Sequence, residues 1–248
     1  MMIEARNIKR SFGDHHVLDG VSFSIARGES VVIIGASGGG KSVLLRHLIG
    51  LIAPHEGQVL VEGENIVGMN ERQLLKVRRK FGMLFQGAAL FDSMTVEENV
   101  GFMLRRKGVD GQEIAERVAE VLGMVGLSGT QSKKPAELSG GMRKRVGLAR
   151  AVIYKPEILL YDEPTTGLDP IASDSIDKLI IEVVDHLKVT SIAVTHDMRS
   201  ARRIGKRILM LYQGRIYADA TPAEIFASAD PVIYKFVNGI SDPLEHGL

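Results

Sequence analysis

Residues 30–42 read SVVIIGASGGGKS and decide the fold of this 248-residue chain. The run 31–34 is apolar and β-branched without alternation, which is typical of a strand buried on both faces. Residues 35–42 then fit the phosphate-binding pattern G-x-x-x-x-G-K-[ST]. Apolar side chains follow on one helical face, at Leu44, Leu45, Leu48, Ile49 and Ile52. The order strand, glycine loop, helix is the context that this pattern needs.

The glycines of this loop let successive backbone N–H groups point inward at phosphate oxygens, and the following helix adds the positive end of its dipole. Lys41 supplies a point charge for the terminal phosphates, and the Ser42 hydroxyl is a candidate ligand of Mg²⁺. We therefore predict a nucleotide site. Its candidate binding residues are Ser37, Gly38, Gly39, Gly40, Lys41, Ser42 and Val43.

Strand and helix patterns alternate beyond the loop. Apolar runs at 158–161 and 192–195 indicate two more buried strands, and a helical pattern at 176–187 separates them, which predicts a parallel sheet. Residues 2–26 hold two alternating segments on either side of a turn, and 58–67 holds a third. These three segments predict a small antiparallel sheet near the N-terminus.

The predicted fold class is α/β. It comprises a P-loop NTPase core with a parallel sheet, an N-terminal antiparallel β-subdomain and an inserted α-helical subdomain. We expect one domain over residues 2–240, with the helical subdomain at 88–155 and a short C-terminal tail at 241–248.

The composition narrows the function. Lys plus Arg is 31 and Asp plus Glu is 30, so the net charge of +1 does not draw the chain to nucleic acid. The basic runs at 72–80 and 199–207 are predicted to be solvated helix faces, since only 5% of residues are aromatic and could stack on bases. With no cysteine, disulfide and thiolate zinc chemistry are excluded. No stretch approaches the ~18 apolar residues of a membrane span, so we expect a cytosolic chain that reaches a membrane through a partner.

Two carboxylates end the strand at 158–161. Asp162 is the candidate on the Mg²⁺ side, and Glu163 is then placed to polarise a water molecule for attack on the γ-phosphate. A strand that ends this way beside a phosphate-binding loop favours nucleotide hydrolysis.

Residues 138–142 read LSGGM and open a basic helix. A serine and two glycines at a helix start offer a hydroxyl and bare N–H groups to a second anion, although alone they are also a common helix cap. LSGGM stands about 20 residues before Asp162, and with the phosphate loop, LSGGM and the acidic strand end in this order, the chain resembles the ATPase subunits of ABC transporters. The resemblance covers essentially residues 2–225.

This resemblance implies the ABC ATPase fold, ATP and Mg²⁺ as ligands, and a homodimer that holds ATP between the phosphate loop of one copy and the LSGGM signature of the other. Phe12 resembles the aromatic that stacks on adenine, a position more often Tyr in the family. Gln86 resembles the glutamine that reaches Mg²⁺ and the attacking water and links the site to the membrane partner. His196 resembles the switch histidine of the γ-phosphate.

The residues implied to act across the dimer are Ser139, Gly140, Gly141 and Asp169. Asp169 is alternatively a plain cap of the helix that follows it. The implied metal ligands are Ser42, Gln86 and Asp162. Two residues depart from the family's usual pattern. Val43 lacks a hydroxyl that would reach the α-phosphate, and Met142 stands where Gln is usual. We expect somewhat weaker nucleotide affinity and unimpaired hydrolysis.

Two other functions compete with that of a transporter ATPase, namely a soluble ATPase that acts on DNA or ribosomes and a small-molecule kinase. Soluble relatives that act on DNA carry long coiled-coil insertions between the phosphate loop and the signature, whereas Lys41 and Ser139 are 98 positions apart (139 − 41). Ribosome-associated relatives usually have two cassettes, and this chain has one. A small-molecule kinase would leave the signature and His196 unexplained. We therefore expect an integral membrane permease as partner and no nucleic acid.

The cargo can be approached only through resemblance. Residues 138–142, 85–94 and 236–239 look like those of the ATPase of Mla-type phospholipid transporters. Those systems maintain lipid asymmetry in Gram-negative outer membranes, with a permease dimer and a periplasmic MCE-domain lipid-binding partner. The implied location is the cytoplasmic face of the inner membrane. An importer of amino acids or other small solutes is the competing assignment, and its ATPase would more often carry Gln at position 142.

Overall fold

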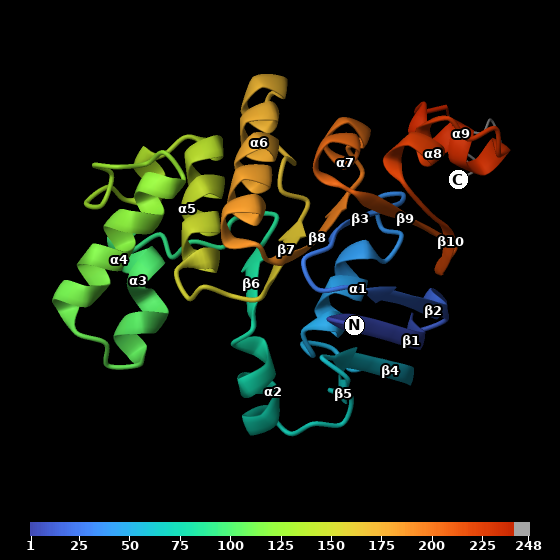
Figure 1. Ribbon diagram of the computed structural model, residues 1–248, viewed down its shortest axis with the longest axis horizontal. Helices are drawn as coiled ribbons and strands as arrows, with labels where there is room; N and C mark the ends of the chain where they lie inside the picture. Colours follow the sequence, from blue (N-terminus) through green and yellow to red (C-terminus); the bar gives the residue numbers. More distant parts are fainter. Residues whose placement is uncertain (241–248) are drawn as a thin grey trace.

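The strands divide between two sheets (Figure 1). The computed structural model describes residues 1–240. Its larger sheet contains β3 (Ser30–Ile34), β6 (Phe81–Leu84), β7 (Ile158–Asp162), β8 (Thr190–Thr195), β9 (Arg207–Tyr212) and β10 (Arg215–Ala220). The order is β10-β9-β3-β8-β7-β6. All neighbours pair in parallel except β10, which is antiparallel to β9. The α/β fold predicted from the sequence is confirmed.

The smaller sheet is antiparallel. It contains β1 (Ile3–Phe12), β2 (His15–Ile25), β4 (Glu56–Val61) and β5 (Glu64–Asn65), in the order β2-β1-β4-β5. The single strand expected at 58–67 is therefore wrong in detail, because a turn at Gly63 divides it into β4 and β5. The Asp19 N–H donates to the Gly214 carbonyl at 2.8 Å and joins the two sheets.

The helices cover both faces of the larger sheet. They are α1 (Lys41–Leu48), α2 (Glu71–Arg78), α3 (Val96–Arg106), α4 (Gly111–Met124), α5 (Gly140–Val152), α6 (Pro170–Leu187), α7 (Met198–Ile204), α8 (Pro222–Phe226) and α9 (Pro231–Val237), with a 3₁₀ turn at Pro135–Glu137. Helices α3, α4 and α5 pack together at one end of the molecule, on the left of Figure 1. The 88–155 boundary of the helical subdomain stays a prediction, and the expected tail at 241–248 lies outside the described residues.

Strand β3 shows why the apolar run at the start of the phosphate loop does not alternate. Val31 and Ile33 belong to the core cluster that includes α1, while Val32 and Ile34 belong to the cluster that includes α6 and α7. All four are at most 1% exposed. A strand with helices on both faces buries every side chain, which places its carboxyl end and the following loop at a fixed edge of the core.

Strand β6 and helix α5 approach each other closely at two glycines. A Cβ on Gly82 would lie 2.3 Å from the Ala151 carbonyl oxygen, and one on Gly147 would lie 2.8 Å from the Leu84 side chain. Both distances are shorter than any real contact. The two elements are therefore in backbone contact at Gly82, and at Gly147 the helix backbone lies against the Leu84 side chain, so a larger residue at either position would displace its neighbour.

One carboxylate is buried between α6 and α7. Asp177 is 2% exposed, accepts a hydrogen bond from the Ser200 hydroxyl at 2.9 Å, and has one oxygen without a partner among the described residues. Burial raises the pKa of Asp177 from 3.8 to about 6. At neutral pH this group is charged in the folded and unfolded chain alike, and its burial opposes folding. As the pH falls through 6, Asp177 takes up a proton in the folded chain before it does so in the unfolded chain. Its burial then opposes folding less.

Asp177→Asn is accordingly expected to raise the free energy of unfolding at pH 7.5, because it removes a buried charge. The gain should shrink by about 1 kcal/mol at pH 5.0, where the folded wild type is already protonated. Urea unfolding followed by circular dichroism at both pH values measures it. Asp174→Asn is the control, and it should lower the free energy of unfolding at pH 7.5. Hydrogen bonding to Lys178 and the charge of Arg203 lower the pKa of Asp174, so its charged form stabilises the folded chain. A gain that does not change with pH would contradict the titration of Asp177.

Candidate active site

The loop after β3 wraps around a lysine. Gly40 takes a left-handed conformation (φ 93°) at the N-cap of α1, and Lys41 follows it, 5% exposed. The Lys41 ammonium donates to the carbonyls of Gly35 at 2.9 Å and Ala36 at 3.0 Å. The glycine loop, the helix start and the lysine charge converge on one place, which suits a polyphosphate.

Two oxygen ligands lie side by side at the edge of the sheet. The Ser42 hydroxyl donates to the Asp162 carboxylate at 2.6 Å, across 120 positions of sequence. Mg²⁺ takes hydroxyl, carboxylate, phosphate and water oxygens and usually needs only one or two protein carboxylates. No group of three or more His, Cys, Asp or Glu side chains within residues 1–240 could hold a metal by itself. The Ser42 and Asp162 pair therefore fits a Mg²⁺ whose other ligands come from a nucleotide and water.

Glu163 is the centre of the cluster. Its side chain lies 3.4 Å from the Lys41 ammonium, 2.9 Å from Nδ1 of His196 and 3.2 Å from the Thr166 hydroxyl. Its φ of 49° is left-handed, a conformation that costs a non-glycine residue about 1–2 kcal/mol. Strain of this kind is kept where the surrounding structure fixes it, often at functional sites. Lys41, Glu163 and His196, which the sequence places far apart, thus meet.

Other predicted residues lie at element ends. Gln86 follows β6 and is exposed. Phe12 ends β1 and is 47% exposed, with the Arg10 guanidinium 4.8 Å from its ring centroid. Val43 packs in part against the core beneath α1. Their roles toward a nucleotide stay predictions.

The residues predicted to act across a dimer cap helices. The Ser139 hydroxyl accepts from the Met142 N–H at the start of α5. The Asp169 carboxylate accepts from the N–H groups of Ile171 and Ala172, both at 2.9 Å, so the alternative interpretation as a helix cap is seen directly. Within residues 1–240, no hydrogen bond or ion pair joins Ser139 or Asp169 to Lys41 or Glu163. Both remain accessible for a role between two copies.

Lys144 is a further residue of the site that the sequence did not predict, because it stands in a basic stretch at the start of a helix. It is 5% exposed, and its ammonium donates to the main-chain carbonyls of Gln86 and Glu163. Burial lowers the pKa of Lys144, against the attraction of Asp162 and Glu163. A signal existed, because Lys144 shares the apolar face of α5 with Leu148 and Ala151, at i+4 and i+7.

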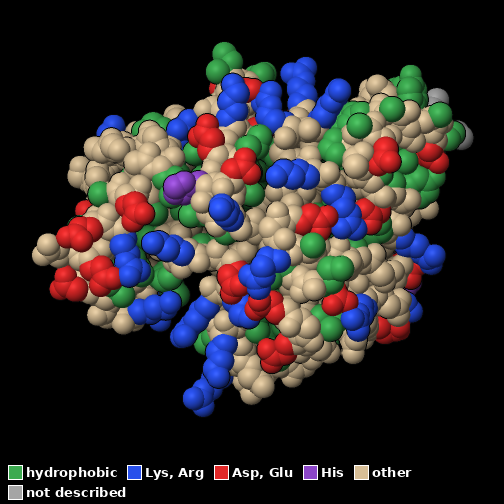
Figure 2. Space-filling model, viewed as in Figure 1, with side chains coloured by type: hydrophobic (Ala, Val, Ile, Leu, Met, Phe, Trp, Pro, Cys, Tyr) green, Lys and Arg blue, Asp and Glu red, His purple; other side chains and the backbone are tan. Residues whose placement is uncertain are grey.

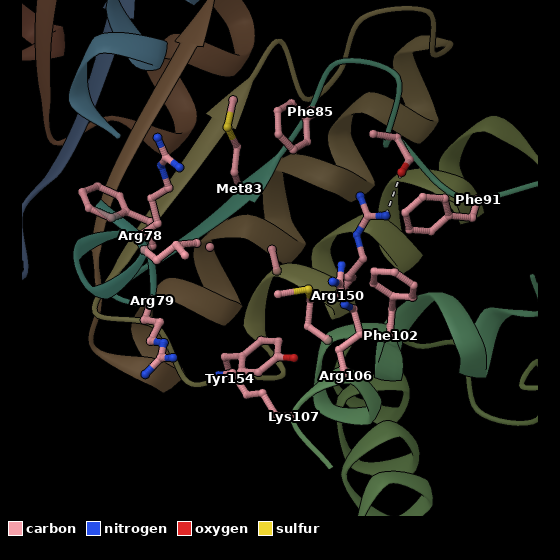
Figure 3. Close-up of a pocket in the computed structure, with 16 residues that line it drawn as sticks. Arg78, Arg79, Met83, Phe85, Phe91, Phe102, Arg106, Lys107, Arg150 and Tyr154 are labelled. Carbon is pink, nitrogen blue, oxygen red and sulfur yellow. Dashed lines mark hydrogen bonds between the residues drawn. The ribbon is translucent and has the colours of Figure 1, made fainter. Parts of the chain in front are cut away.

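A groove of about 720 Å³ lies between α2, β6 and the helical end of the molecule. Five cationic side chains line it and none of its lining residues within the described chain is acidic. The cations are Arg78, Arg79, Arg106, Lys107 and Arg150. Figure 3 shows them lining the groove together with Phe85 and Phe91, which are both exposed. In Figure 2, Lys and Arg side chains surround a hollow on this side of the molecule.

The loop that borders the groove is held by one arginine. Ala88 and Ala89 are both left-handed, with φ of 57° and 50°. Arg150 of α5 donates to both of their carbonyls at 2.7 Å, and Figure 3 draws the bond to Ala89. The basic runs at 72–80 and 199–207 were expected to be solvated helix faces, and this expectation is wrong for two of their members. Arg78 donates to the Ile49 and Gly50 carbonyls, and Arg207 binds Asp219 and Glu29.

The family model described as ABC transporter matches residues 18–166, more than half of the chain. Among solved structures, a dimeric post-hydrolysis state of the ATP-binding cassette MJ0796 bound to ADP and Pi is 33% identical. The match covers 89% of this chain and 99% of that one, with a TM-score of 0.81.

Three curated relatives carry different names. The protein TRIGALACTOSYLDIACYLGLYCEROL 3, chloroplastic, of Arabidopsis thaliana is 42% identical over 98% of this chain and 75% of its own length. The probable ribonucleotide transport ATP-binding protein mkl of Mycobacterium leprae is 39% identical over 96% of this chain and 69% of its own length. The methionine import ATP-binding protein MetN of Carboxydothermus hydrogenoformans is 42% identical over 90% and 66%. Two of the three names describe ATP-binding proteins of transport systems, one for ribonucleotides and one for methionine.

Proposed function

This chain belongs to the ABC transporter family, and on that premise we propose that it is the Mg²⁺-dependent ATPase subunit of a transporter that moves phospholipid. The observation that carries the ATPase assignment is the meeting of Lys41, Ser42, Asp162, Glu163 and His196 at one edge of the sheet. Phosphate binding, metal ligation and activation of water are thereby gathered within a few ångströms.

Each group has a distinct part in hydrolysis. Lys41 and the loop N–H groups bind the β- and γ-phosphates of ATP. Ser42 and Asp162 would hold Mg²⁺, with Gln86 reaching toward it, and the ion would neutralise charge on the phosphates. Glu163 accepts the proton of the attacking water, and His196 orients the Glu163 carboxylate and the γ-phosphate.

The complete site requires a second copy of the chain. Ser139, Gly140 and Gly141 open α5 with a hydroxyl and N–H groups that suit a γ-phosphate presented by another copy. Asp169 stands at the start of α6, beside Ile171, which is 84% exposed. An isoleucine so exposed at the proposed contact is consistent with burial in a homodimer.

The groove supports a membrane permease as the second partner. Its lining is mostly apolar and carries five cationic side chains. A short cytoplasmic helix of the permease, with apolar anchors and acidic side chains, complements both features. Within the described chain, no helix is long and apolar enough to span a bilayer. The permease would hold the ATPase at the cytoplasmic face of the inner membrane.

Ala89→Glu is expected to weaken assembly with the permease by at least about tenfold, because a carboxylate at the groove would face the acidic side chains of the helix. Ala89 is exposed and lines the groove, so the isolated subunit should fold and bind ATP normally. Co-purification and titration with the permease in detergent measure the effect. Ala89→Gln is the matched control, since it adds the same bulk at the same left-handed position without charge. Equal loss in both variants would point to shape instead of charge.

Phospholipid is the cargo that the resemblance to Mla-type ATPases supports, and the Arabidopsis relative carries the name of a glycolipid. The corresponding system would add a periplasmic MCE-domain lipid-binding protein. Import of an amino acid or other small solute is the second candidate, favoured by the similarity to MetN.

A deletion strain tests the cargo. Without this protein, cells should become sensitive to detergent and accumulate phospholipid in the outer leaflet of the outer membrane. Wild-type chain should restore both properties, and Glu163→Gln should restore neither. An intact outer membrane combined with loss of uptake of an amino acid would reject the phospholipid assignment and leave the ATPase assignment in place.

A further inference from the structure

A buried lysine bridges two loops of the active site without contacting a phosphate-binding residue. Lys144 is 5% exposed, and no described carboxylate lies within ion-pair distance of its ammonium. Its partners are the carbonyls of Gln86 and Glu163. Burying an ammonium group that has no direct ion pair costs free energy, even with Asp162 and Glu163 nearby, so packing alone would be served better by a neutral side chain.

The two carbonyls belong to segments 77 positions apart (163 − 86). Gln86 lies just beyond the end of β6 and Glu163 just beyond the end of β7, and these strands are neighbours in the sheet. Lys144 of α5 donates to both carbonyls, so one side chain connects the helix to the ends of two neighbouring strands.

Glu163 is thereby held at both ends of its main chain. Its N–H donates to the Val194 carbonyl at 3.0 Å, and its carbonyl accepts from Lys144 at 3.2 Å and from the Thr166 N–H at 3.3 Å. Between these bonds the residue keeps a left-handed φ of 49°. In that conformation the carboxylate reaches His196 and Thr166. Relaxation of the backbone toward a common conformation would turn the carboxylate away from them.

We propose that Lys144 is a positioning residue for hydrolysis, which fixes the main chain of Glu163 and ties it to the loop that begins at Gln86. This inference rests on the proposed ATPase function. Because Arg150 holds Ala88 and Ala89 from the same helix, α5 grips that loop at its beginning and at the groove. A displacement of the loop is therefore passed to Glu163 through Lys144.

Lys144→Met in the full chain provides the first test. Methionine keeps an unbranched side chain of similar length and removes the charge. The kcat for ATP should fall at least about tenfold, as expected when a catalytic group is misplaced by a fraction of an ångström to 1 Å. The KM for ATP should stay within about threefold, because the phosphate loop is untouched. Lys178→Met is the control, since Lys178 is exposed and forms only a surface pair with Asp174.

Chemical rescue separates charge from packing. The chain contains no cysteine, so Lys144→Cys introduces a unique thiol. Alkylation of the unfolded variant with 2-bromoethylamine, followed by refolding, rebuilds an ammonium side chain of lysine length. Alkylation with 1-bromopropane gives its neutral counterpart. Wild-type chain taken through the same unfolding and refolding sets the reference. The aminoethyl form should recover most of the wild-type kcat, and the propyl form should match Lys144→Met.

The outcomes distinguish the inference from the function on which it rests. If Glu163→Gln is inactive while Lys144→Met and the propyl form keep kcat within about twofold of the reference, Lys144 has no positioning role. Equal activity of the aminoethyl and propyl forms would overturn the proposal even if Lys144→Met failed to fold. If Glu163→Gln itself hydrolyses ATP at the wild-type rate, the proposed active site is wrong.

Discussion

Glu163→Gln is expected to reduce ATP hydrolysis at least about 100-fold, the usual loss when general-base assistance is removed. Glutamine keeps the shape of the side chain and can still accept a hydrogen bond from Thr166. It cannot accept the proton of the attacking water. ATP binding should be retained, and the variant should accumulate as a dimer with ATP and Mg²⁺. Phosphate release in the assembled complex and size-exclusion chromatography measure the two effects.

Lys41→Ala is the contrasting control. It removes the point charge from the phosphate loop and should weaken ATP binding itself, which equilibrium titration with a fluorescent ATP analogue measures. Near wild-type turnover in Glu163→Gln would remove Glu163 from the mechanism and leave the contacts of this carboxylate with Lys41 and His196 without a catalytic explanation.

Ser139→Arg is expected to abolish hydrolysis while each copy still binds ATP. The arginine would occupy the space where the γ-phosphate of the other copy must enter. The substitution also removes the cap of α5, whose loss costs about 1 kcal/mol, so a thermal melt should show a modest decrease only. Ser132→Arg is the matched control, because Ser132 is exposed and precedes the signature.

Mixing two inactive variants sharpens this test. Each proposed site takes Lys41 from one copy and Ser139 from the other. A mixed dimer of Lys41→Ala and Ser139→Arg chains therefore contains one site with both residues intact, and mixing should restore turnover that neither variant has alone. Full activity of Ser139→Arg by itself would contradict the arrangement of ATP between two copies.

Local patterns predicted much of the fold. The strand, glycine loop and helix at 30–48 follow one another directly, so their contacts depend on short stretches of sequence. The meeting of Ser42 with Asp162 was also predictable, because carboxyl ends of parallel strands gather at one edge of a sheet. The segment at 58–67 was expected as one strand although Gly63 is typical of a turn, and the two short strands β4 and β5 pair across that turn.

Long-range polar contacts could not be read in the same way. Lys144 stands in a run of three basic residues, and its partner Gln86 is 58 positions away (144 − 86). Arg207 likewise binds Glu29, 178 positions away. In each case the amino acid type indicates a solvated surface, and only the packing of the surrounding elements reveals that the charge is used in a contact with a distant part of the chain.

The backbone contact of β6 with α5 has a mechanical consequence. At Gly82 the strand lies directly against the Ala151 carbonyl, and at Gly147 the helix backbone lies directly against the Leu84 side chain, so neither glycine adds a side chain of its own that could yield under load. The 13 residues of α5 span about 20 Å. Helix α5 and strand β6 are therefore expected to move together as one rigid body. A push on the groove end is delivered at the far end, where Ser139 stands, instead of being absorbed by rearranging side chains on the way.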